Sequence, residues 1–274
     1  MYAIPSRPMY GLSESIRIIR TIGLFEGIGG FPYAAKQIGG FLWEGSVEND
    51  PSCIKVLERN FSHPIFGDIR SFHPKLGEYD FMVGGFPCSG TSSAGDKTGL
   101  DHPESSLYKE FIRCIEEGRP SMVLLEQPEG FLYRGYETWV EKVSEIGYEV
   151  LDPIILGCHQ IGGSYRRVRV FSLSYAPDRT WKIRQGRWQY QVRTLVEEFG
   201  TSAHWLTIER AGDVAVARLP TGLPGTGDVC LHAEKGQRGR REARRLIGQT
   251  VSVPQAALAL SAAKWVWYQR GDWV

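Results

Sequence analysis

The first quarter of the chain alternates apolar runs suited to strands with glycine turns and helix-compatible stretches. Residues 18–24 are a strand candidate, and the turn FEGIGGF at residues 25–31 (the glycine turn) leads into a helix expected to end near residue 38. Further strands are expected at 42–47 and 64–66, with a helix at 53–60 between them. Strands that alternate with helices are typical of a parallel sheet, whose strands end at one ligand-binding edge. This order predicts an α/β fold with a nucleoside-binding half-sheet.

Two acids follow successive strands of this half-sheet. Glu48 lies at the tip of the second strand, where nucleoside-binding folds bind ribose hydroxyls, and Asp68 lies after the third, where it could accept from an exocyclic amine. The glycine turn would let backbone approach a ligand closely, and the following helix N-terminus favours negative charge. A tight turn without a ligand and acids that only decorate the surface are the alternatives. Two acids at successive strand ends favour the nucleoside site.

Residues 80–99 read DFMVGGFPCSGTSSAGDKTG, in which a buried strand runs into a loop of small and polar residues. This places Cys88 at a sheet edge, where α/β folds keep their active sites. A buried structural thiol is the alternative, but its neighbours are too small and polar to bury it. The five cysteines form no C-x-x-C pair, and no signal peptide or membrane span is evident. We therefore expect reduced thiols, no zinc site and a soluble protein of the cytoplasm.

A second group of candidate chemistry lies between residues 107 and 171. A helix at 107–117 and a strand at 121–125 lead to Glu126, and Pro128 is expected to end the strand. A helix at 139–146 and a strand at 148–156 follow. Residues 165–171 alternate cations with apolar residues, which would put Arg167 and Arg169 on one strand face. These guanidiniums point to the site, unless the segment is a solvated edge strand.

The composition changes after residue 174. With a net charge of +1, a nucleic-acid surface must come from local clusters of cations. Residues 179–193 interleave arginine and lysine with Trp181, Trp188 and Tyr190, which suits phosphate contacts and base stacking better than a solvated face. Residues 235–245 form a second cationic cluster. The segment GQTVSVP at 248–254 precedes an apolar helix at 255–268, expected to pack on the sheet.

From about residue 18 to residue 265 the chain resembles the cytosine-5 DNA methyltransferase family. In family order the matching motifs are FEGIGGF, Glu48, GDI at 67–69, FPCSGTSSAG at 86–95 (the Pro-Cys loop), EQP at 126–128, RRVRVF at 166–171 and GQTVSVP at 248–254. The chain departs from the usual family residues at Ser89, Gln127, Tyr165 and Gln249.

The resemblance implies a Rossmann-like methyltransferase sheet with helices on both faces, plus a small irregular target-recognition region. It implies a catalytic S-adenosylmethionine-binding domain at 1–173, the target-recognition region at 174–245 and a C-terminal motif and helix at 246–274 that complete the catalytic domain. The implied activity is methyl transfer to carbon 5 of a flipped-out cytosine in double-stranded DNA, as in restriction-modification. Cys88 would form a covalent adduct with the base, Glu126, Arg167 and Arg169 would assist, and Gly84 and Gly85 would give the loop mobility.

The resemblance also implies two sets of binding residues. The cofactor would contact Phe25, Gly27, Gly29, Gly30, Glu48, Asn49, Asp68, Ile69, Phe86, Pro87, Leu107, Gln249 and Thr250. DNA would contact Ser89, Ser92, Arg184, Arg187, Trp188, Arg240 and Arg241. We expect a monomer without metal, of bacterial origin or encoded by a phage. An RNA (tRNA) cytosine-5 methyltransferase on the same scaffold and a catalytically idle DNA-binding member are the alternatives.

Overall fold

The computed structural model describes residues 17–87, 100, 105–163, 166–177, 181, 187–200, 210–211, 214–215, 245–246, 248 and 250–269. The strands are β1 (Ile19–Leu24), β2 (Phe41–Val47), β3 (Ile65–Phe66), β4 (Phe81–Gly84), β5 (Met122–Pro128), β6 (Glu149–Val150), β7 (Ile154–Gly157), β8 (Val168–Tyr175), β9 (Arg210–Ala211) and β10 (Val214–Ala215). The α-helices are α1 (Gly30–Ile38), α2 (Pro51–Asn60), α3 (Tyr108–Gly118), α4 (Phe131–Arg134), α5 (Tyr136–Glu145), α6 (Arg187–Gly200) and α8 (Val253–Trp267), and short 3-10 turns are η1 (Ile69–Ser71), η3 (Ser105–Leu107) and η4 (Cys158–Ile161).

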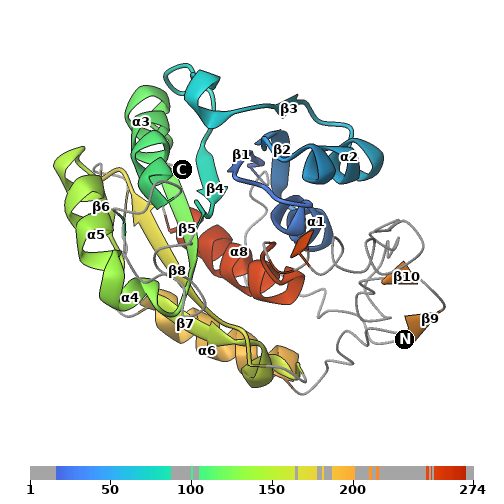
Figure 1. Ribbon diagram of the computed structural model, residues 1–274. Helices are drawn as coiled ribbons and strands as arrows, with labels where there is room; N and C mark the ends of the chain where they lie inside the picture. Colours follow the sequence, from blue (N-terminus) through green and yellow to red (C-terminus); the bar gives the residue numbers. More distant parts are fainter. Residues whose placement is uncertain are drawn as a thin grey trace.

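The main sheet has the strand order β3-β2-β1-β4-β5-β8-β6, with β7 also paired to β8. The strands from β3 to β5 are mutually parallel, whereas β8 runs antiparallel to β5. The order reverses between β1 and β4, which is the position where ligands bind in doubly wound sheets. The prediction of a Rossmann-like α/β sheet is confirmed (Figure 1).

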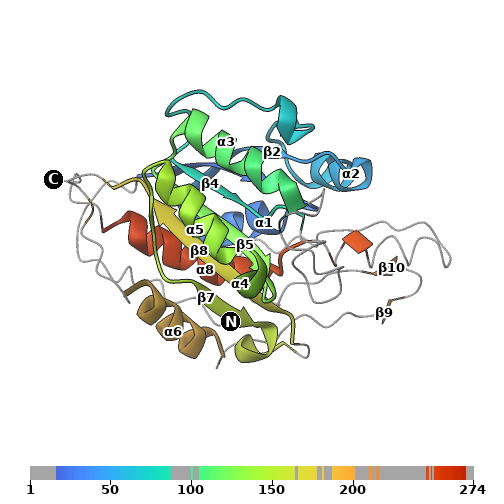
Figure 2. The same cartoon turned by 60° about the vertical axis from the view of Figure 1, so that its left-hand side comes forward.

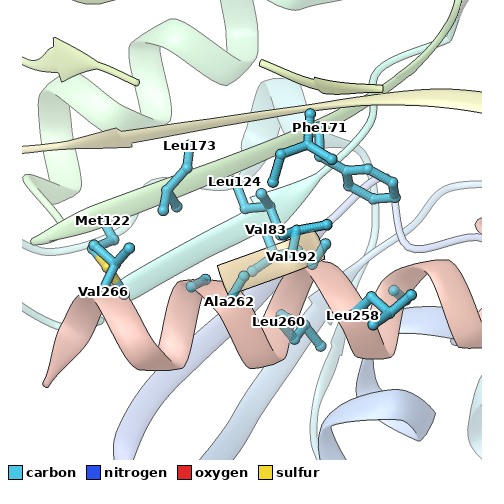
Figure 3. Packing of buried hydrophobic residues seen from close by; sticks show 14 of the residues in the cluster. Val83, Met122, Leu124, Phe171, Leu173, Val192, Leu258, Leu260, Ala262 and Val266 are labelled. Carbon is cyan, nitrogen blue, oxygen red and sulfur yellow. The ribbon is translucent and has the colours of Figure 1, made fainter. Parts of the chain in front are cut away.

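Helices cover both faces of this sheet, as predicted (Figure 2). Alternate strand residues serve the two layers, since successive side chains in a strand point to opposite faces. Phe81 and Val83 pack with α1, α6 and α8, while Met82 between them packs with α3 and α5. The apolar residues of α8 belong to the same core cluster as the strand residues: Val266 lies beside Met122, and Leu258 lies toward the other end of the helix, on the side of Phe171 (Figure 3).

Most predicted elements are present, and their ends follow from local chemistry. At α2, Pro51 occupies the first turn and the Asp50 carboxylate accepts from the Ser52 amide at 2.8 Å, which fixes the helix start. The strand predicted at 148–156 is wrong as one element: it is divided into β6 and β7. Pro153 lies between them and has no N–H to donate to a ladder.

The strand after Leu125 does not end at Glu126. β5 continues through Gln127 to Pro128, because these residues pair with Val170 and Arg169 of β8. Pro128 is the last residue of the strand, where a missing N–H is tolerated. Glu126 therefore lies on a rigid, paired segment rather than at a free strand end.

Candidate functional site

The ends of β1 and β4 and the neighbouring part of β5 form one row at the point where the strand order reverses. Leu24 pairs with Gly84, and Gly84 pairs with Leu125. The next residues along the three strands are Phe25, Gly85 and Glu126, so the glycine turn, the entrance to the Pro-Cys loop and the predicted acid are neighbours. Cys88, Ser89 and Ser92 lie outside the described residues.

Glu126 lies next to Arg169. The Arg169 Nε atom is 2.7 Å from the Glu126 Oε1 atom, and the two side chains are only 17% and 13% exposed. Arg169 is opposite Pro128 in the antiparallel pair, which places it diagonally across from Glu126 on the same face. The contact is an ion pair without aligned hydrogen-bond geometry. β5 and β8 thus bring two of the predicted catalytic residues together.

Arg167 takes a different direction. It precedes β8 and has a φ of +23°, so the expectation that Arg167 and Arg169 share one strand face is wrong. The Arg167 guanidinium donates to the carbonyl oxygens of Gly248 at 3.1 Å and Thr250 at 2.5 Å. Its backbone carbonyl accepts from the buried Gln255 amide at 2.9 Å, which holds this unusual conformation. The catalytic role of Arg167 stays a prediction.

The glycine turn contacts the segment that leads into the first turn of α8, which we call the closing segment (residues 245–255). The Ile28 amide donates to the Thr250 hydroxyl at 3.1 Å. A Cβ added at Gly27 would lie 2.7 Å from the Thr250 Oγ1 atom, and one at Gly30 would lie 2.7 Å from the Val251 carbonyl oxygen. The space that the missing side chains of these two glycines leave is therefore occupied by the Thr250 side chain and the Val251 backbone. Gly29 has a φ of +91° and lies against Phe61.

Glu48 organises the β2 side of the row. Its carboxylate accepts from the backbone amides of Gly27 at 2.7 Å, Asn49 at 2.9 Å and Asp50 at 2.8 Å. Burial raises the pKa of Glu48, and the three amide bonds act in the opposite direction. The side chain at the tip of β2 thus holds the glycine turn against the start of α2.

Asp68 and Ile69 follow β3 at the sheet edge. Asp68 caps η1 by accepting from the Arg70 amide at 2.9 Å and forms an ion pair with the Arg70 guanidinium, while Ile69 is buried. A cavity of about 350 Å³ lies beside them and is lined by Phe66, Phe72 and other residues of this loop. Of the described residues predicted to bind a cofactor, only Asp68 lines it, so the cavity does not mark the row of strand ends.

Phe86 and Pro87 begin the Pro-Cys loop. The Phe86 ring is 2% exposed and packs against Phe131 and Trp139. The ring thus belongs to the core beside α4 and α5, and a role of Phe86 in cofactor binding stays a prediction. Leu107 is half-buried at the end of η3, before α3.

Two further residues at this site were missed by the sequence reasoning. The Gln127 amide is buried and donates to the Phe86 carbonyl at 2.9 Å, which ties the Pro-Cys loop to β5. Glu26 is 4% exposed and accepts from the Ser46 hydroxyl at 3.3 Å. Burial raises the pKa of Glu26 well above its ordinary range, and the Glu48 charge acts in the same direction. A polar residue within an apolar strand and an acid within a glycine turn were the available signals.

Gly84 and Gly85 have a steric role. A Cβ at Gly84 would lie 2.1 Å from the Leu24 carbonyl oxygen, and one at Gly85 would lie 2.5 Å from the Glu126 carbonyl oxygen. Gly84 belongs to β4 and is held by its ladder. The expectation that these glycines supply mobility is not what the packing indicates: they let three strands end close together.

The predicted DNA-binding residues are only partly described. Arg187 is exposed at the start of α6. Trp188 is 1% exposed and its indole N–H donates to the Asp152 carbonyl at 2.9 Å. This burial argues against base stacking by the indole, and the role of Trp188 in DNA binding stays a prediction. The indole belongs to the core because α6 packs on α8. The other predicted DNA and cofactor residues that lie outside the described part of the chain are Arg184, Arg240, Arg241 and Gln249.

The described residues include neither a candidate metal cluster nor a candidate membrane-spanning helix. Among them, no group of three or more histidine, cysteine, aspartate or glutamate side chains could hold a metal ion. No helix in the described ranges is both long enough and apolar enough to cross a membrane.

Comparison with known proteins gives one consistent result. The family described as C-5 cytosine-specific DNA methylase matches residues 19–211. The type II methyltransferase M1.ScrFI of Lactococcus lactis subsp. cremoris is 32% identical over 161 residues, which are 57% of this chain and 41% of that protein. The type II methyltransferase M.HhaI of Haemophilus parahaemolyticus is 25% identical over 244 residues, which are 86% of this chain and 74% of that protein. The chain thus spans less than half the length of M1.ScrFI.

A solved structure shares the fold over nearly its whole length. A putative DNA modification methyltransferase encoded within an E. coli prophage aligns with a TM-score of 0.55 at 19% identity, covering 91% of this chain and 99% of that one. The family match runs from β1 through the glycine turn, Glu126 and Arg169 to β9. With most of its length matched in this way, the chain belongs to the C-5 cytosine-specific DNA methylase family.

Proposed function

We propose that the protein transfers a methyl group from S-adenosylmethionine to carbon 5 of a cytosine flipped out of double-stranded DNA. The observation that carries the proposal is the Glu126–Arg169 ion pair between β5 and β8, beside β4, the strand that enters the Pro-Cys loop. Membership of the DNA methylase family supports the reaction class. The pairing places an acid and a cation on rigid strands where the loop with Cys88 begins.

The reaction needs a nucleophile, since carbon 5 of cytosine reacts only after another group has added to carbon 6. A thiol suits this addition, but a free cysteine with a pKa of about 8.5 is mostly protonated at neutral pH. The proposed site must therefore favour the Cys88 thiolate and also hold a proton at ring nitrogen 3. Glu126 is assigned the second task, and Arg169 orients its carboxyl group and compensates its charge.

The steps follow from these assignments. The Cys88 sulfur forms a bond to carbon 6, while nitrogen 3 receives a proton that it shares with Glu126, and the electron pair moves to carbon 5. S-adenosylmethionine, when bound, would supply the electrophilic methyl group to carbon 5, and its sulfonium sulfur would leave in S-adenosylhomocysteine. Loss of the proton from carbon 5 then expels the Cys88 sulfur and restores the aromatic ring. A base inside a duplex cannot present carbon 6 to a side chain, so the target must first be flipped out.

The residues at the strand ends fit a nucleoside cofactor. A carboxylate has about four lone-pair positions, and the three amides that donate to Glu48 leave it one for a ribose hydroxyl. Phe25 lies at the end of β1 and Asp68 at the end of β3, which flank the same sheet edge. We assign Glu48 to the ribose, Asp68 to the adenine amine, and Phe25, Leu107 and the closing segment to the walls.

DNA is the proposed partner, approached through the cationic residues near the start of α6. Arg187 is the exposed residue that begins this helix. The proposed place of action is the cytoplasm of a bacterium or of a phage-infected host, which is supported by relatives such as the L. lactis M1.ScrFI.

The test uses a duplex in which 5-fluorocytosine replaces the target base. Carbon 5 then has no proton to lose, so the enzyme–DNA adduct should survive denaturation as a band that requires both Cys88 and S-adenosylmethionine. Cys88→Ala should abolish the band while retaining DNA binding, because the thiol makes no phosphate contact. Cys114→Ala is the matched control and should retain the band: its thiol is fully buried in α3, and burial raises its pKa to about 12.

A second variant separates the acid from the nucleophile. Glu126→Gln keeps the side-chain shape but cannot supply the proton, so adduct formation should slow by about 10²–10⁴-fold. A band that persists in Cys88→Ala would place the nucleophile elsewhere. Labelled methyl transfer to tRNA without transfer to DNA would favour the RNA methyltransferase, and DNA binding without any transfer would favour the idle member.

A further inference from the structure

We propose that Arg167 is a positioning residue that fastens the closing segment (residues 245–255) onto the glycine turn, and that it thereby controls the affinity for the cofactor without touching it. The inference rests on the proposed function, because it concerns the S-adenosylmethionine site. It assigns Arg167 a task distinct from that of Arg169, which pairs with Glu126. Arg167 would thus act on the closing segment and the glycine turn, whereas Arg169 acts on Glu126.

The closing segment contacts the residues proposed to hold the cofactor at two points, one in the glycine turn and one at the start of α2. The Thr250 hydroxyl accepts from the Ile28 amide at 3.1 Å, in the middle of the glycine turn. The Arg245 guanidinium forms an ion pair with Asp50, whose own amide donates to Glu48 at 2.8 Å. A displacement of the closing segment would therefore move the turn and the carboxylate that are proposed to hold the cofactor.

The same segment is fixed to the other half of the sheet. The Arg167 guanidinium donates to the carbonyls of Gly248 and Thr250, so it grips the segment on both sides of residue 249. The buried Gln255 amide donates to the Leu156 carbonyl at 2.6 Å and to the Arg167 carbonyl at 2.9 Å. The segment thus bridges β7 and the residues before β8 to the end of β1.

The packing leaves little freedom for the segment to sit elsewhere. Gly27 and Gly30 bring the turn so close to Thr250 and Val251 that a Cβ at either glycine would overlap them. Thr250 therefore lies in direct contact with the turn, and the charged Arg167 guanidinium donates to its carbonyl. Hydrogen bonds from a charged donor are worth more than neutral ones, so loss of this hydrogen bond should loosen the contact with Ile28.

The experiment is calorimetric titration of the full-length chain with S-adenosylhomocysteine in the absence of DNA. Arg167→Ala should raise the Kd by about tenfold or more at unchanged stoichiometry, whereas Arg167→Lys, which keeps one charged donor, should recover part of the loss. The matched control is Arg166→Ala, because that side chain is 78% exposed and 4.0 Å from Glu129. It should bind like the wild type.

A double-mutant comparison tests whether Arg167 acts through the contact between Thr250 and the glycine turn. Thr250→Val removes the acceptor for the Ile28 amide, so it should weaken binding by itself, and adding Arg167→Ala should cost less than the sum of the single effects. A general folding defect would instead lower the stoichiometry and leave the Kd of the folded fraction unchanged, which would overturn the proposal. Wild-type affinity in Arg167→Ala would overturn it as well, while absent binding in the wild type would refute the proposed function and the inference together.

Discussion

Trp188→Ala can distinguish a core role of Trp188 from a DNA-binding role. A core role predicts a large loss of folding stability, whereas a DNA-binding role predicts a loss of DNA affinity. The indole is 1% exposed and its N–H donates to the Asp152 carbonyl at 2.9 Å. Replacing a buried tryptophan by alanine costs about 3–5 kcal/mol of folding free energy, of which the hydrogen bond accounts for about 1 kcal/mol. A base-stacking tryptophan would instead cost about 1–3 kcal/mol of DNA affinity per base and little stability. Trp188→Ala should therefore lower the urea midpoint strongly.

The comparison needs a control on the same helix. Tyr190 is 70% exposed, so Tyr190→Ala should change the free energy of unfolding by no more than about 0.5 kcal/mol. Trp188→Phe keeps a large ring and should lose roughly 1–2 kcal/mol, chiefly through the missing N–H. DNA affinity is then measured at a temperature where each variant is fully folded. The core assignment would be refuted by a Trp188→Ala protein with the wild-type urea midpoint and about tenfold weaker DNA binding.

Two further substitutions test the acid in the glycine turn and the steric role of a glycine. The folded chain holds a proton on Glu26 at pH values where the unfolded chain has lost it, so stability falls as pH rises above about 4.3, the ordinary glutamate pKa. Glu26→Gln should therefore reduce the change of the urea midpoint between about pH 5 and about pH 8. Its stability relative to the wild type should be greatest at the higher pH, whereas the exposed control Glu58→Gln should keep the wild-type pH dependence. Gly85→Ala should push its Cβ against Glu126, costing about 1–3 kcal/mol and slowing adduct formation, whereas Gly67→Ala, with no atom within 4 Å of its added Cβ, should do neither.

The order of strands and helices along the chain could be predicted, because each element has a signal in its own local sequence. Apolar runs alternate with helix-compatible stretches along residues 19–66, and a chain of this kind returns to the same sheet edge after each helix. The acids Glu48 and Asp68 follow their strands directly, so their placement at that edge follows from the order of the elements. The cations at residues 165–171 are predicted to point to the site, and Arg169 forms an ion pair with Glu126 there.

Side-chain direction could not be predicted in the same way. The indole of Trp188 and the ring of Phe86 turn into the core because of helices that pack on them, which no neighbouring residue in the sequence reveals. Arg167 and Arg169 differ because a left-handed backbone angle before β8 breaks the alternation of the strand. That angle is stabilised by Gln255, which lies 88 residues away along the chain.

The motif of the glycine turn predicts where the turn lies in the sheet, but it does not predict which atoms approach its glycines. From the sequence, Gly27 and Gly30 are expected to let a ligand approach the backbone, but the atoms that come close belong to Thr250 and Val251. The amides of Gly27 and Ile28 are already bound, by Glu48 and Thr250 respectively. A nucleoside cofactor would therefore meet a turn whose shape is set by the chain itself, with Glu48 holding it from one side and the closing segment from the other. A site organised in this way is preorganised before the ligand arrives, so residues that never touch the cofactor contribute to its affinity.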